Sequence, residues 1–314
     1  MQLHRRDLLG IKDLAAEEIT GILDAAQEFK KIFSCAQKKF MMLKGKTIVT
    51  LFYEPSTRTR TSFETAGKWL GADVINIAVA TSSVQKGENL RDTAKTLQAM
   101  GVDMIVIRHS AAGVPQMLAG VIEAGIINAG DGANEHPTQA LLDFFTIREK
   151  YKSFQNLKIT IVGDILHSRV ARSNIWGLLK LGATVTVVGP PTLIPPGLEH
   201  LGVRITNDLR EGIQDADVIN ILRIQLERQK KGLFPSIGEY TEFYGINQQK
   251  LLEWAKPDVL VMHPGPANLG VEISEDTSSG RFSAITEQVT NGVAVRMALL
   301  YLLAGGRTED VVIN

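Results

Sequence analysis

Residues 47–70 read TIVTLFYEPSTRTRTSFETAGKWL, and this stretch indicates the fold class. It opens with an apolar, β-branched run that predicts a buried strand over Thr47–Tyr53. Apolar residues such as Phe63, Ala66 and Leu70 then follow at helical spacing. A buried strand that leads directly into a helix is typical of α/β proteins, in which helices cover both faces of a parallel sheet.

The same alternation continues along the rest of the chain. Short β-branched runs recur between helical patterns, and we predict a strand for each: Asp73–Val79, Met104–Ile107, Ile126–Asn128, Lys158–Val162, Thr184–Val188, Ala216–Leu222 and Val259–Met262. We predict an amphipathic helix that is capped by Asp13, and an apolar helix near the other end that is stopped by Gly305 and Gly306. The chain is therefore predicted to be an α/β protein.

The length of 314 residues favours two domains, although a one-domain barrel stays open at this stage. The most helical connector ends near residue 150, after which NLKITIVGD begins a second series of strands. We predict two doubly wound domains, each a mostly parallel sheet flanked by helices, with the active site in the cleft between them. Residues 1–150, joined by the C-terminal helix at about 288–314, form the first domain, and 151–287 form the second.

Charge and cysteine content exclude several classes of protein. The 34 basic and 34 acidic residues cancel, so net charge provides no attraction to nucleic acid or to a membrane surface. No apolar run approaches the roughly 20 residues that span a bilayer. The single cysteine, Cys35, cannot form an internal disulfide, and the N-terminal residues lack a secretory pattern. We expect a cytoplasmic protein with no nucleic-acid or membrane partner.

The polar residues after the first strand predict an anion site. Residues 56–59, of sequence STRT, stand where a parallel strand ends and a helix begins, and open α/β sheets bind ligands at such ends. Backbone N–H groups, hydroxyls and a guanidinium together suit a phosphate. The alternative is an ordinary capped helix with Arg58 and Arg60 in solvent. We favour the phosphate, because arginine is unfavourable at a helix N-terminus unless an anion offsets its charge.

Two more strand ends in the first half carry polar residues. Arg108 ends the run MIVIRHS, and GIINAGDGANEHPTQ contains a glycine-rich turn before His136. Pro137 suits the first position of a helix, which makes His136 the expected cap, with its imidazole facing the same crevice. A histidine in this setting is more often structural. With arginines at the neighbouring strand ends, however, His136 is a candidate to polarise a carbonyl oxygen.

The second half offers ligands for carboxylates. Arg169 follows one strand and Arg223 ends another, with Gln225 just beyond, so two guanidiniums on separate loops can each clamp a carboxylate. Either arginine alone would be an ordinary surface ion-pair partner. The turn HPGP follows a third strand, and its rigid backbone would let the carbonyls of Pro264 and Gly265 accept hydrogen bonds from a ligand amine. A merely rigid turn is the alternative.

Several familiar motifs are missing from the sequence. The segment IVGD lacks the G-x-G-x-x-G pattern of nicotinamide-binding sheets, and no G-x-x-x-x-G-K-[ST] loop occurs. The six histidines show no metal-ligand spacing, so no metal is expected. No G-x-S-x-G elbow supports a serine hydrolase.

Taken together and in this order, STRTR, HPTQ, GDILHSR, LRIQLERQ and HPGP closely resemble the catalytic chains of the aspartate carbamoyltransferase family, over nearly the whole chain. The motifs S-T-R-T and H-P-x-Q are shared across carbamoyltransferases and imply carbamoyl phosphate as the donor. Ornithine-using relatives normally carry H-C-L-P in place of HPGP, so L-aspartate is the implied acceptor. The implied products are N-carbamoyl-L-aspartate and phosphate, in an early step of de novo pyrimidine biosynthesis that uses no cofactor.

The resemblance also implies roles for individual residues. It assigns carbamoyl phosphate to Ser56, Thr57, Arg58, Thr59, Arg108, His136, Gln139, Pro264 and Gly265. Within that set, Thr59, Arg108 and His136 would be catalytic, because they would also address the carbamoyl oxygen. Aspartate would be bound by Lys86, Arg169, Arg223 and Gln225.

A homotrimer with shared active sites is a further implication. In the family, the loop that matches Ser82 to Lys86 reaches into the site of the neighbouring subunit. From the residues alone, Lys86 is an ordinary solvated loop lysine. The sequence leaves open whether trimers join regulatory chains or a dihydroorotase.

One departure from the family pattern is Leu269, which stands where many relatives with this motif have an arginine. We expect it to weaken a loop contact and to leave the ligand set intact. Two rival functions stay open at this point. One is a carbamoyltransferase with another acceptor, such as ornithine or a modified ornithine, and the other is a non-catalytic anion-binding or scaffolding subunit that retains the fold.

Overall fold

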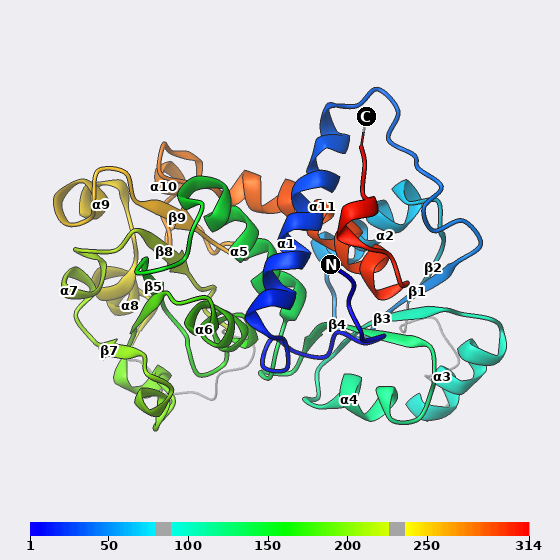
Figure 1. Ribbon diagram of the computed structural model, residues 1–314. Helices are drawn as coiled ribbons and strands as arrows, with labels where there is room; N and C mark the ends of the chain where they lie inside the picture. Colours follow the sequence, from blue (N-terminus) through cyan, green and yellow to red (C-terminus); the bar gives the residue numbers. More distant parts are fainter. Residues whose placement is uncertain (79–88, 226–235, 314) are drawn as a thin grey trace. The chain divides into compact units, whose positions relative to one another are not determined.

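The computed structural model describes residues 1–78, 89–225 and 236–313 (Figure 1). The chain divides into two compact units. Unit 1 comprises Met1–Phe145 with Val289–Asn314, and unit 2 comprises Thr146–Gln288. The division therefore falls within α5 (Pro137–Tyr151) and near the start of α11 (Ile285–Leu303).

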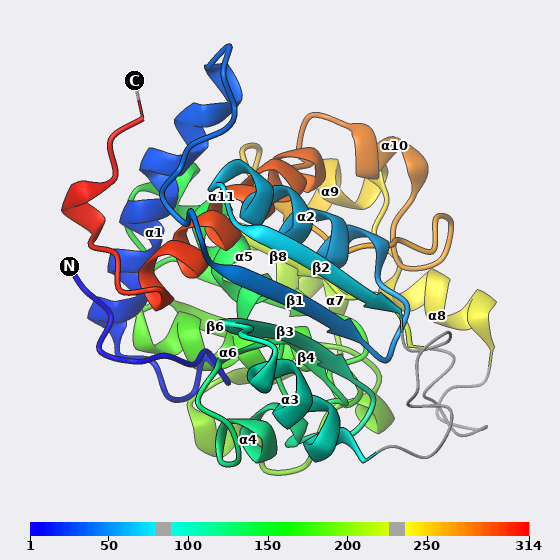
Figure 2. The ribbon, with the colours of Figure 1, turned by 90° about the vertical axis from the view of Figure 1, so that its right-hand side faces the viewer.

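Unit 1 alternates strands and helices around one parallel sheet. In chain order its elements are α1 (Ala16–Lys30), the 3₁₀ helix η1 (Lys31–Ser34), β1 (Thr47–Phe52), α2 (Thr57–Trp69), β2 (Asp73–Ala78), α3 (Leu90–Ala99), β3 (Met104–His109), α4 (Val114–Ala119), β4 (Gly125–Asp131), most of α5, most of α11 and η6 (Thr308–Asp310). The strands pair in parallel in the order β2-β1-β3-β4, and Figure 2 shows them side by side.

Helices cover both faces of this sheet, which explains why its strands are apolar almost throughout. Val49 and Leu51 of β1 pack with α3 and α4 in one hydrophobic cluster. The opposite face lies against α2 and α11, because a Cβ on Gly67 of α2 would come within 3.4 Å of Ile48 in β1 and 3.9 Å of Leu300 in α11. In Figure 2, α2 and α11 accordingly lie on one side of the strands and α3 and α4 on the other.

The N-terminal segment extends this sheet beyond β4. Leu8 forms a parallel bridge with Ile127, in which the Leu8 amide donates to Ile126 O at 2.8 Å and the Asn128 amide donates to Leu8 O at 2.9 Å. The backbone groups of Ile126 and Asn128 on the outer side of β4 are therefore paired within the chain, which shortens the exposed edge of the sheet.

Unit 2 contains a second parallel sheet. Its elements are the last turn and a half of α5, β5 (Lys158–Val162), α6 (Arg169–Lys180), β6 (Thr184–Val188), η4 (Pro191–Leu193), η5 (Leu198–Leu201), β7 (Arg204–Thr206), α7 (Leu209–Ile213), β8 (Val218–Ile221), α8 (Ile237–Tyr244), α9 (Gln248–Trp254), β9 (Leu260–Met262), α10 (Glu275–Ser279) and the first residues of α11. The strand order is β7-β6-β5-β8-β9, and every pair is parallel.

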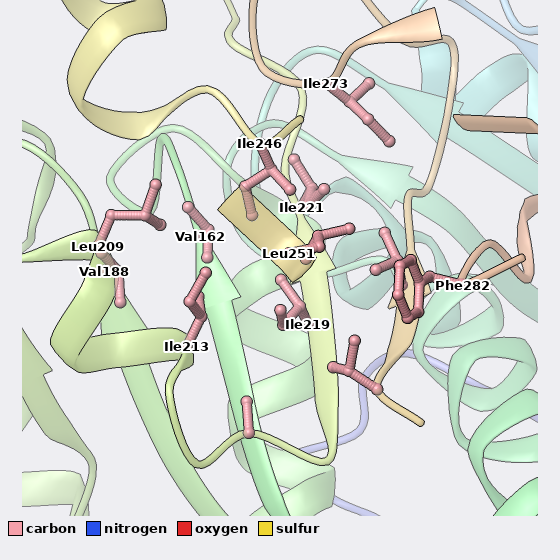
Figure 3. Packing of buried hydrophobic residues seen from close by; sticks show 13 residues of the cluster. Val162, Val188, Leu209, Ile213, Ile219, Ile221, Ile246, Leu251, Ile273 and Phe282 are labelled. Atoms are coloured by element: carbon pink, nitrogen blue, oxygen red, sulfur yellow. The ribbon is translucent and has the colours of Figure 1, made fainter. Parts of the chain in front are cut away.

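A buried cluster fixes one face of the second sheet (Figure 3). Val162 of β5 and Ile219 and Ile221 of β8 pack there with Ile213 of α7 and Leu251 of α9, and each of the five is at most 1% exposed. Fully burying one such side chain is worth about 1.5–3 kcal/mol. The cluster thus holds helices and strands of unit 2 in one core.

All eight predicted strands are present, and the doubly wound α/β fold is confirmed while the one-domain barrel is excluded. The strand β7 was not predicted. The predicted cap at Asp13 is wrong, because α1 begins at Ala16 and its N-cap is Ala15, whose amide donates to the Glu18 carboxylate at 2.9 Å.

The final long helix ends where its glycines predict. It stops at Leu303, and Gly305 has a φ of +94°, a conformation that side chains with a Cβ rarely adopt. In the part of the chain that the structure describes, no helix has both the length and the apolar character needed to cross a membrane.

Candidate active site

The predicted phosphate residues lie at the topological switch point of unit 1. From β1 the chain adds β2 on one side and then β3 and β4 on the other, so the strand order reverses between β1 and β3. Ligands of open α/β sheets bind at the carboxyl ends of the strands at such a point. Ser56 and the first turn of α2 follow β1, and Arg108 lies near the end of β3, where it is the register partner of Phe52.

The side chains at this point contact one another. Nη1 of Arg108 donates to the Ser56 hydroxyl at 3.2 Å, and Nε of Arg108 donates to the Glu54 carboxylate at 3.2 Å. Arg108 and Glu54 are both largely buried, at 17% and 18% side-chain exposure. Arg58 and Arg60 are exposed and Thr59 is buried, so the first turn of α2 presents two cations to solvent. The structure thus brings Ser56 and Arg108 together.

A hydrogen-bonded turn connects β4 to α5 and carries His136. Its centre is Asp131, which is fully buried. One carboxylate oxygen of Asp131 accepts from the Asn128 amide group at 2.8 Å and the Glu135 backbone N–H at 3.2 Å, and the other accepts from the Gly113 N–H at 2.7 Å. These donors fix the turn on both sides, so His136, which directly precedes α5, follows a rigid support.

His136 and Gln139 are themselves buried, at 4% and 8% exposure. The His136 carbonyl accepts from the amides of Gln139 and Ala140, which places the residue directly before the first helical position, Pro137, as predicted. The Gln139 side chain donates to Asp143 at 2.9 Å, one turn further along α5. Gln139 is therefore held within the helix, with its amide tied to a buried carboxylate.

A buried carboxylate immediately precedes His136. Glu135 is 6% exposed, and its two oxygens accept from the backbone amides of Ile11 at 2.7 Å and Lys12 at 3.3 Å. Gly10 lies against it so closely that a Cβ there would be 2.3 Å from Glu135 Oε1. The N-terminal loop therefore helps to set the position of the residue before His136.

The predicted carboxylate ligands lie at the switch point of unit 2. From β5 the chain adds β6 and β7 on one side and then β8 and β9 on the other. Arg169 begins α6 beyond β5 and is 5% exposed, whereas Arg223 and Gln225 follow β8 and are half-buried. Because β5 and β8 are neighbours, the loops that carry these side chains leave the sheet side by side.

The loop before Arg169 is held by its own polar side chains. The buried carboxylate of Asp164 accepts from the His167 backbone N–H at 3.1 Å and contacts Nδ1 of the His167 ring at 2.9 Å. Ser168 then caps α6 by accepting from the Ala171 N–H at 3.1 Å. Arg169 therefore starts from a loop and a helix end that are both fixed.

The turn HPGP follows β9, which is the neighbour of β8. Pro264 and Gly265 are half-buried, the Gly265–Pro266 peptide is cis, and Gly265 has a φ of +61°. Glycine adopts a positive φ more readily than residues with a Cβ, so this position favours its glycine. The turn therefore stands beside the loop of Arg223 at the carboxyl edge of the sheet.

Leu269 lies just beyond this turn, with 53% of its surface exposed. The segment is closed by a bridge between Leu269 and Ile273 and by the Gly270 amide, which donates to Ile273 O at 2.9 Å. Backbone contacts thus hold the segment that carries Leu269.

Burial perturbs the ionisation of two rings near these loops. Burial lowers the pKa of His109, and the negative charges of Glu54 and Asp131 oppose this only in part. Burial also raises the pKa of Tyr240, with the charges of Glu272 and Asp164 acting in the same direction. Among the residues that the structure describes, no group of three or more His, Cys, Asp or Glu side chains is arranged to hold a metal ion.

Ser82 and Lys86 lie outside the described residues. Three carboxylates that form hydrogen bonds beside the candidate site residues were not predicted, namely Glu54, Glu135 and Glu272. Glu54 stands inside the EPSTRTR stretch itself, so an acid beside two arginines was the signal that could have revealed it. No local pattern marks Glu135 or Glu272, because their partners lie elsewhere in the chain or across a turn.

Comparison with known families resolves what these two sites belong to. Residues 6–149 match the family model "Aspartate/ornithine carbamoyltransferase, carbamoyl-P binding domain", and residues 155–303 match "Aspartate/ornithine carbamoyltransferase, Asp/Orn binding domain". The chain belongs to the aspartate/ornithine carbamoyltransferase family. The family's two domain models thus meet between residues 149 and 155, within a few residues of the division into units.

Relatives within this family match over almost their full length. The chain is 63% identical over 306 residues to the aspartate carbamoyltransferase catalytic subunit of Moorella thermoacetica, covering 98% of this chain and 99% of the relative. It is 58% identical over 312 residues to the subunit of the same name from Heliobacterium modesticaldum, covering 99% and 100%. The sequence therefore groups closely with chains that are named for aspartate.

Solved structures of carbamoyltransferases from both acceptor classes, aspartate and ornithine, have the fold of this chain. Aspartate transcarbamoylase from Trypanosoma cruzi, in complex with carbamoyl aspartate and phosphate, has a TM-score of 0.85 at 30% identity and covers 94% of this chain and 95% of its own. Ornithine carbamoyltransferase from Pyrococcus furiosus has a TM-score of 0.84 at 32% identity and covers 96% and 98%. The fold alone therefore does not distinguish the acceptor, which depends on side chains.

Proposed function

We propose that this chain is a catalytic subunit that transfers the carbamoyl group from carbamoyl phosphate to the amine of L-aspartate. The products are N-carbamoyl-L-aspartate and phosphate, and the step supplies pyrimidine biosynthesis. The observation that carries the proposal is that both switch points bear arginines, in a chain that is 63% identical to an aspartate carbamoyltransferase catalytic subunit. Two arginine-bearing strand ends suit one phosphate and one dicarboxylic acid.

Carbamoyl phosphate binds at the switch point of unit 1. The phosphate is held by Ser56, Thr57, Arg58, Thr59 and Arg108, which supply hydroxyls, guanidiniums and the N-terminal amides of α2. The contact of Arg108 with Ser56 at 3.2 Å supports this grouping, because it brings two of the five together before any ligand binds. Glu54 holds the same guanidinium from its other side and so limits the orientations it can adopt.

Catalysis rests on stabilising the carbamoyl oxygen. When the aspartate amine attacks the carbamoyl carbon, negative charge develops on this oxygen, and Thr59, Arg108 and His136 donate to it. One well-placed donor is worth about 2.7–4 kcal/mol of transition-state stabilisation. Holding both reactants in attack geometry contributes about 7–11 kcal/mol more. Gln139 and the carbonyls of Pro264 and Gly265 fix the carbamoyl nitrogen.

Aspartate is bound by the arginines of unit 2. Arg169 and Arg223 each clamp a carboxylate, with Gln225 beside Arg223 and Lys86 completing the set. The burial of Arg169 supports this role, since a cation that is 5% exposed discriminates strongly in favour of an anionic partner. The amine loses its proton to the departing phosphate, because the proposed ligand set contains no carboxylate base.

The acceptor assay tests the proposal directly. The purified full-length protein is incubated with carbamoyl phosphate and either L-aspartate or L-ornithine, and the carbamoylated products are separated. We expect N-carbamoyl-L-aspartate alone. Carbamoyl-ornithine as the only product would show that the acceptor is wrong, and tight binding of carbamoyl phosphate without turnover would show that the chain is a non-catalytic subunit.

A matched pair of variants on α6 tests the aspartate ligands. Arg169 is buried at the first position of the helix, whereas Arg172 is exposed less than one turn later. Arg169→Gln is expected to raise the KM for aspartate by about 100-fold or more, since a charged hydrogen-bonding pair is lost. Arg172→Gln changes the same side-chain type on the same helix and is expected to leave KM unaltered. Equal effects of the two substitutions would remove Arg169 from the site.

The active assembly is a homotrimer whose sites are completed by Ser82 and Lys86 of a neighbouring subunit. Lys86→Ala and His136→Ala are each expected to be inactive, and mixed trimers would contain some sites in which neither substitution is present. Recovered activity after subunit exchange is the expected result. Inactive mixtures in which exchange has been proven by mass spectrometry would exclude shared sites.

The protein works in the cytoplasm. The single thiol, Cys35, supports this, because a chain with one cysteine gains nothing from an oxidising compartment. Cell fractionation with the acceptor assay as readout checks the location, and activity confined to a membrane or secreted fraction would exclude it.

A further inference from the structure

A buried histidine stands directly before the carbonyls that the proposed function gives to the carbamoyl nitrogen. His263 follows the last residue of β9 and is 2% exposed. Its backbone N–H donates to the Gln288 side chain at 3.0 Å, and its Nδ1 accepts from the Gly265 backbone N–H at 2.8 Å. The ring thus reaches over the turn that its own backbone begins.

The turn offers this ring a single backbone donor. Pro264 and Pro266 carry no N–H, so Gly265 is the one residue of the three that can donate from its main chain. His263 Nδ1 takes that donor. The orientation of the Pro264–Gly265 peptide, and with it the direction of the Pro264 carbonyl, is therefore fixed by the imidazole.

The hydrogen bonds also assign the tautomer of the ring. A nitrogen that accepts from an N–H carries a lone pair, so the proton of the imidazole is on Nε2. Nε2 lies 3.2 Å from Oε1 of Glu272, which is fully buried. The Nε2–H therefore donates to Glu272, and this bond sets the plane of the ring.

Glu272 is the centre of a larger network. Its Oε1 also accepts from the Asn268 backbone N–H at 2.6 Å, and its Oε2 accepts from the Asn268 side chain at 3.1 Å. The Asn268 side chain in turn reaches the Ile224 carbonyl at 3.5 Å, between Arg223 and Gln225. One buried carboxylate thus ties the HPGP turn to the loop of Arg223.

We propose that His263 and Glu272 are positioning residues, which orient the Pro264 carbonyl, one of the two carbonyls proposed to bind the nitrogen of carbamoyl phosphate. The inference rests on the proposed function, because it assumes that those carbonyls bind the substrate. Neither side chain touches the reacting atoms. Glu272 holds the imidazole in the Nε2–H tautomer, and the lone pair on Nδ1 holds the peptide of the turn.

Two substitutions separate the functions of the two ring nitrogens. His263→Asn places an amide oxygen near the position of Nδ1 and keeps an acceptor for Gly265. His263→Gln places its amide group near Nε2, so it keeps the link to Glu272 and loses the acceptor. An exposed histidine of the same unit, His200, provides the matched control as His200→Gln.

We expect His263→Gln to lower kcat/KM for carbamoyl phosphate by about 10- to 100-fold, since small misplacements of a positioning group cost rates of this size. His263→Asn is expected to stay within about fivefold of the original protein, and His200→Gln to be indistinguishable from it. Equal losses in both His263 variants, or no loss in His263→Gln, would overturn the inference.

Acetyl phosphate separates positioning from general damage to the fold. It carries a methyl group where carbamoyl phosphate carries its nitrogen, so the two carbonyls give it no hydrogen bond. Its inhibition constant is expected to change by less than about threefold in His263→Gln. A loss of acetyl phosphate binding that parallels the loss for carbamoyl phosphate would show a merely structural role and overturn the inference.

The original protein provides two further tests. If it binds carbamoyl phosphate and acetyl phosphate equally well, the carbonyls do not hold the nitrogen, and the proposed roles of Pro264 and Gly265 fail together with this inference. If the original protein discriminates between the two acyl phosphates but the His263 variants do not fold, ¹⁵N NMR of the histidine-labelled original protein tests the inference through the tautomer of His263. We expect His263 to be protonated on Nε2, and a proton on Nδ1 would refute the mechanism.

Discussion

The contact between Gly10 and Glu135 leads to a prediction with a defined magnitude. In Gly10→Ala, the new Cβ would lie 2.3 Å from Glu135 Oε1, whereas ordinary contact begins near 3.4 Å. The carboxylate must therefore retreat by about 1 Å. That movement breaks its bonds to the Ile11 and Lys12 amides, which are 2.7 and 3.3 Å long.

The destabilisation by Gly10→Ala should equal the loss of these hydrogen bonds. The clash itself is relieved, because the end of the Glu135 side chain can move although the backbone cannot. A hydrogen bond to a charged group is worth about 1.5–3 kcal/mol, and the shorter bond, from the Ile11 amide, accounts for most of the cost, so Gly10→Ala should lower the free energy of unfolding by about that amount. It should also reduce kcat by about tenfold, because Glu135 immediately precedes His136. Glu135→Ala should cost a similar amount, since it removes the same acceptor.

A double-mutant cycle with urea unfolding at fixed protein concentration measures the coupling. In the Glu135→Ala background the clash is absent, and Gly10→Ala should cost less than about 0.5 kcal/mol, which gives a coupling of about 1.5–3 kcal/mol. The control is Gly120→Ala, whose Cβ would meet nothing closer than 3.6 Å. It should be neutral or stabilising by up to about 1 kcal/mol. If Gly10→Ala costs the same with and without the Glu135 carboxylate, the reasoning is refuted.

Three further predictions concern other charged side chains. Arg108→Lys replaces the forked guanidinium by a single ammonium group and should reduce kcat/KM for carbamoyl phosphate by about 100- to 1,000-fold in steady-state assays. Full activity of this variant would contradict the proposed role of Arg108. Burial alone would raise the pKa of Asp103, but hydrogen bonds from Lys46 and a backbone amide outweigh it and hold the pKa below its ordinary 3.8. Asp103→Asn should therefore lower the free energy of unfolding by about 0.5–1 kcal/mol at neutral pH. The difference from the original protein should vanish as the pH falls through the lowered pKa of Asp103, which urea unfolding at several pH values can measure. Burial lowers the pKa of Arg296 to about 10, and the charge of Asp143 opposes this shift. Arg296→Met should lower the stability measured by thermal unfolding by about 3–5 kcal/mol, because it leaves the Asp143 charge buried without Arg296. If adding Asp143→Asn recovers none of this loss, the electrostatic interaction between the two side chains is contradicted.

The strands and the ligand motifs could be predicted because their signals are local. A buried strand that runs into polar residues, as TIVTLFY does before EPSTRTR, needs only neighbouring residues to be recognised. The strand β7 has just one buried position among its three residues, so its pattern is too short to stand out. The cap of α1 was missed because Glu18, a residue inside the helix, reaches back to the Ala15 amide and replaces the cap expected at Asp13.

The supports of the candidate site could not be predicted, because they join residues that are distant in the chain. Glu135 and the Ile11 amide are 124 positions apart, and Glu54 and Arg108 are 54 apart. Their meeting depends on which strands become neighbours, a property of the whole sheet. His263 and Glu272 are only nine positions apart, yet their contact depends on how the intervening turn folds back.

The strand order has a consequence for local unfolding. β1, β3, β5 and β8 each have a strand on both sides, so their amides should be among the slowest to exchange with solvent, and most proposed ligands leave the sheets from these protected strands. The HPGP turn instead leaves from β9, which is three residues long and outermost among the named strands. At this turn the hydrogen bond between the His263 imidazole and the Glu272 carboxylate provides the restraint that neighbouring strands provide elsewhere. Local unfolding of β9 would therefore disturb the contacts to the carbamoyl group before those to the phosphate.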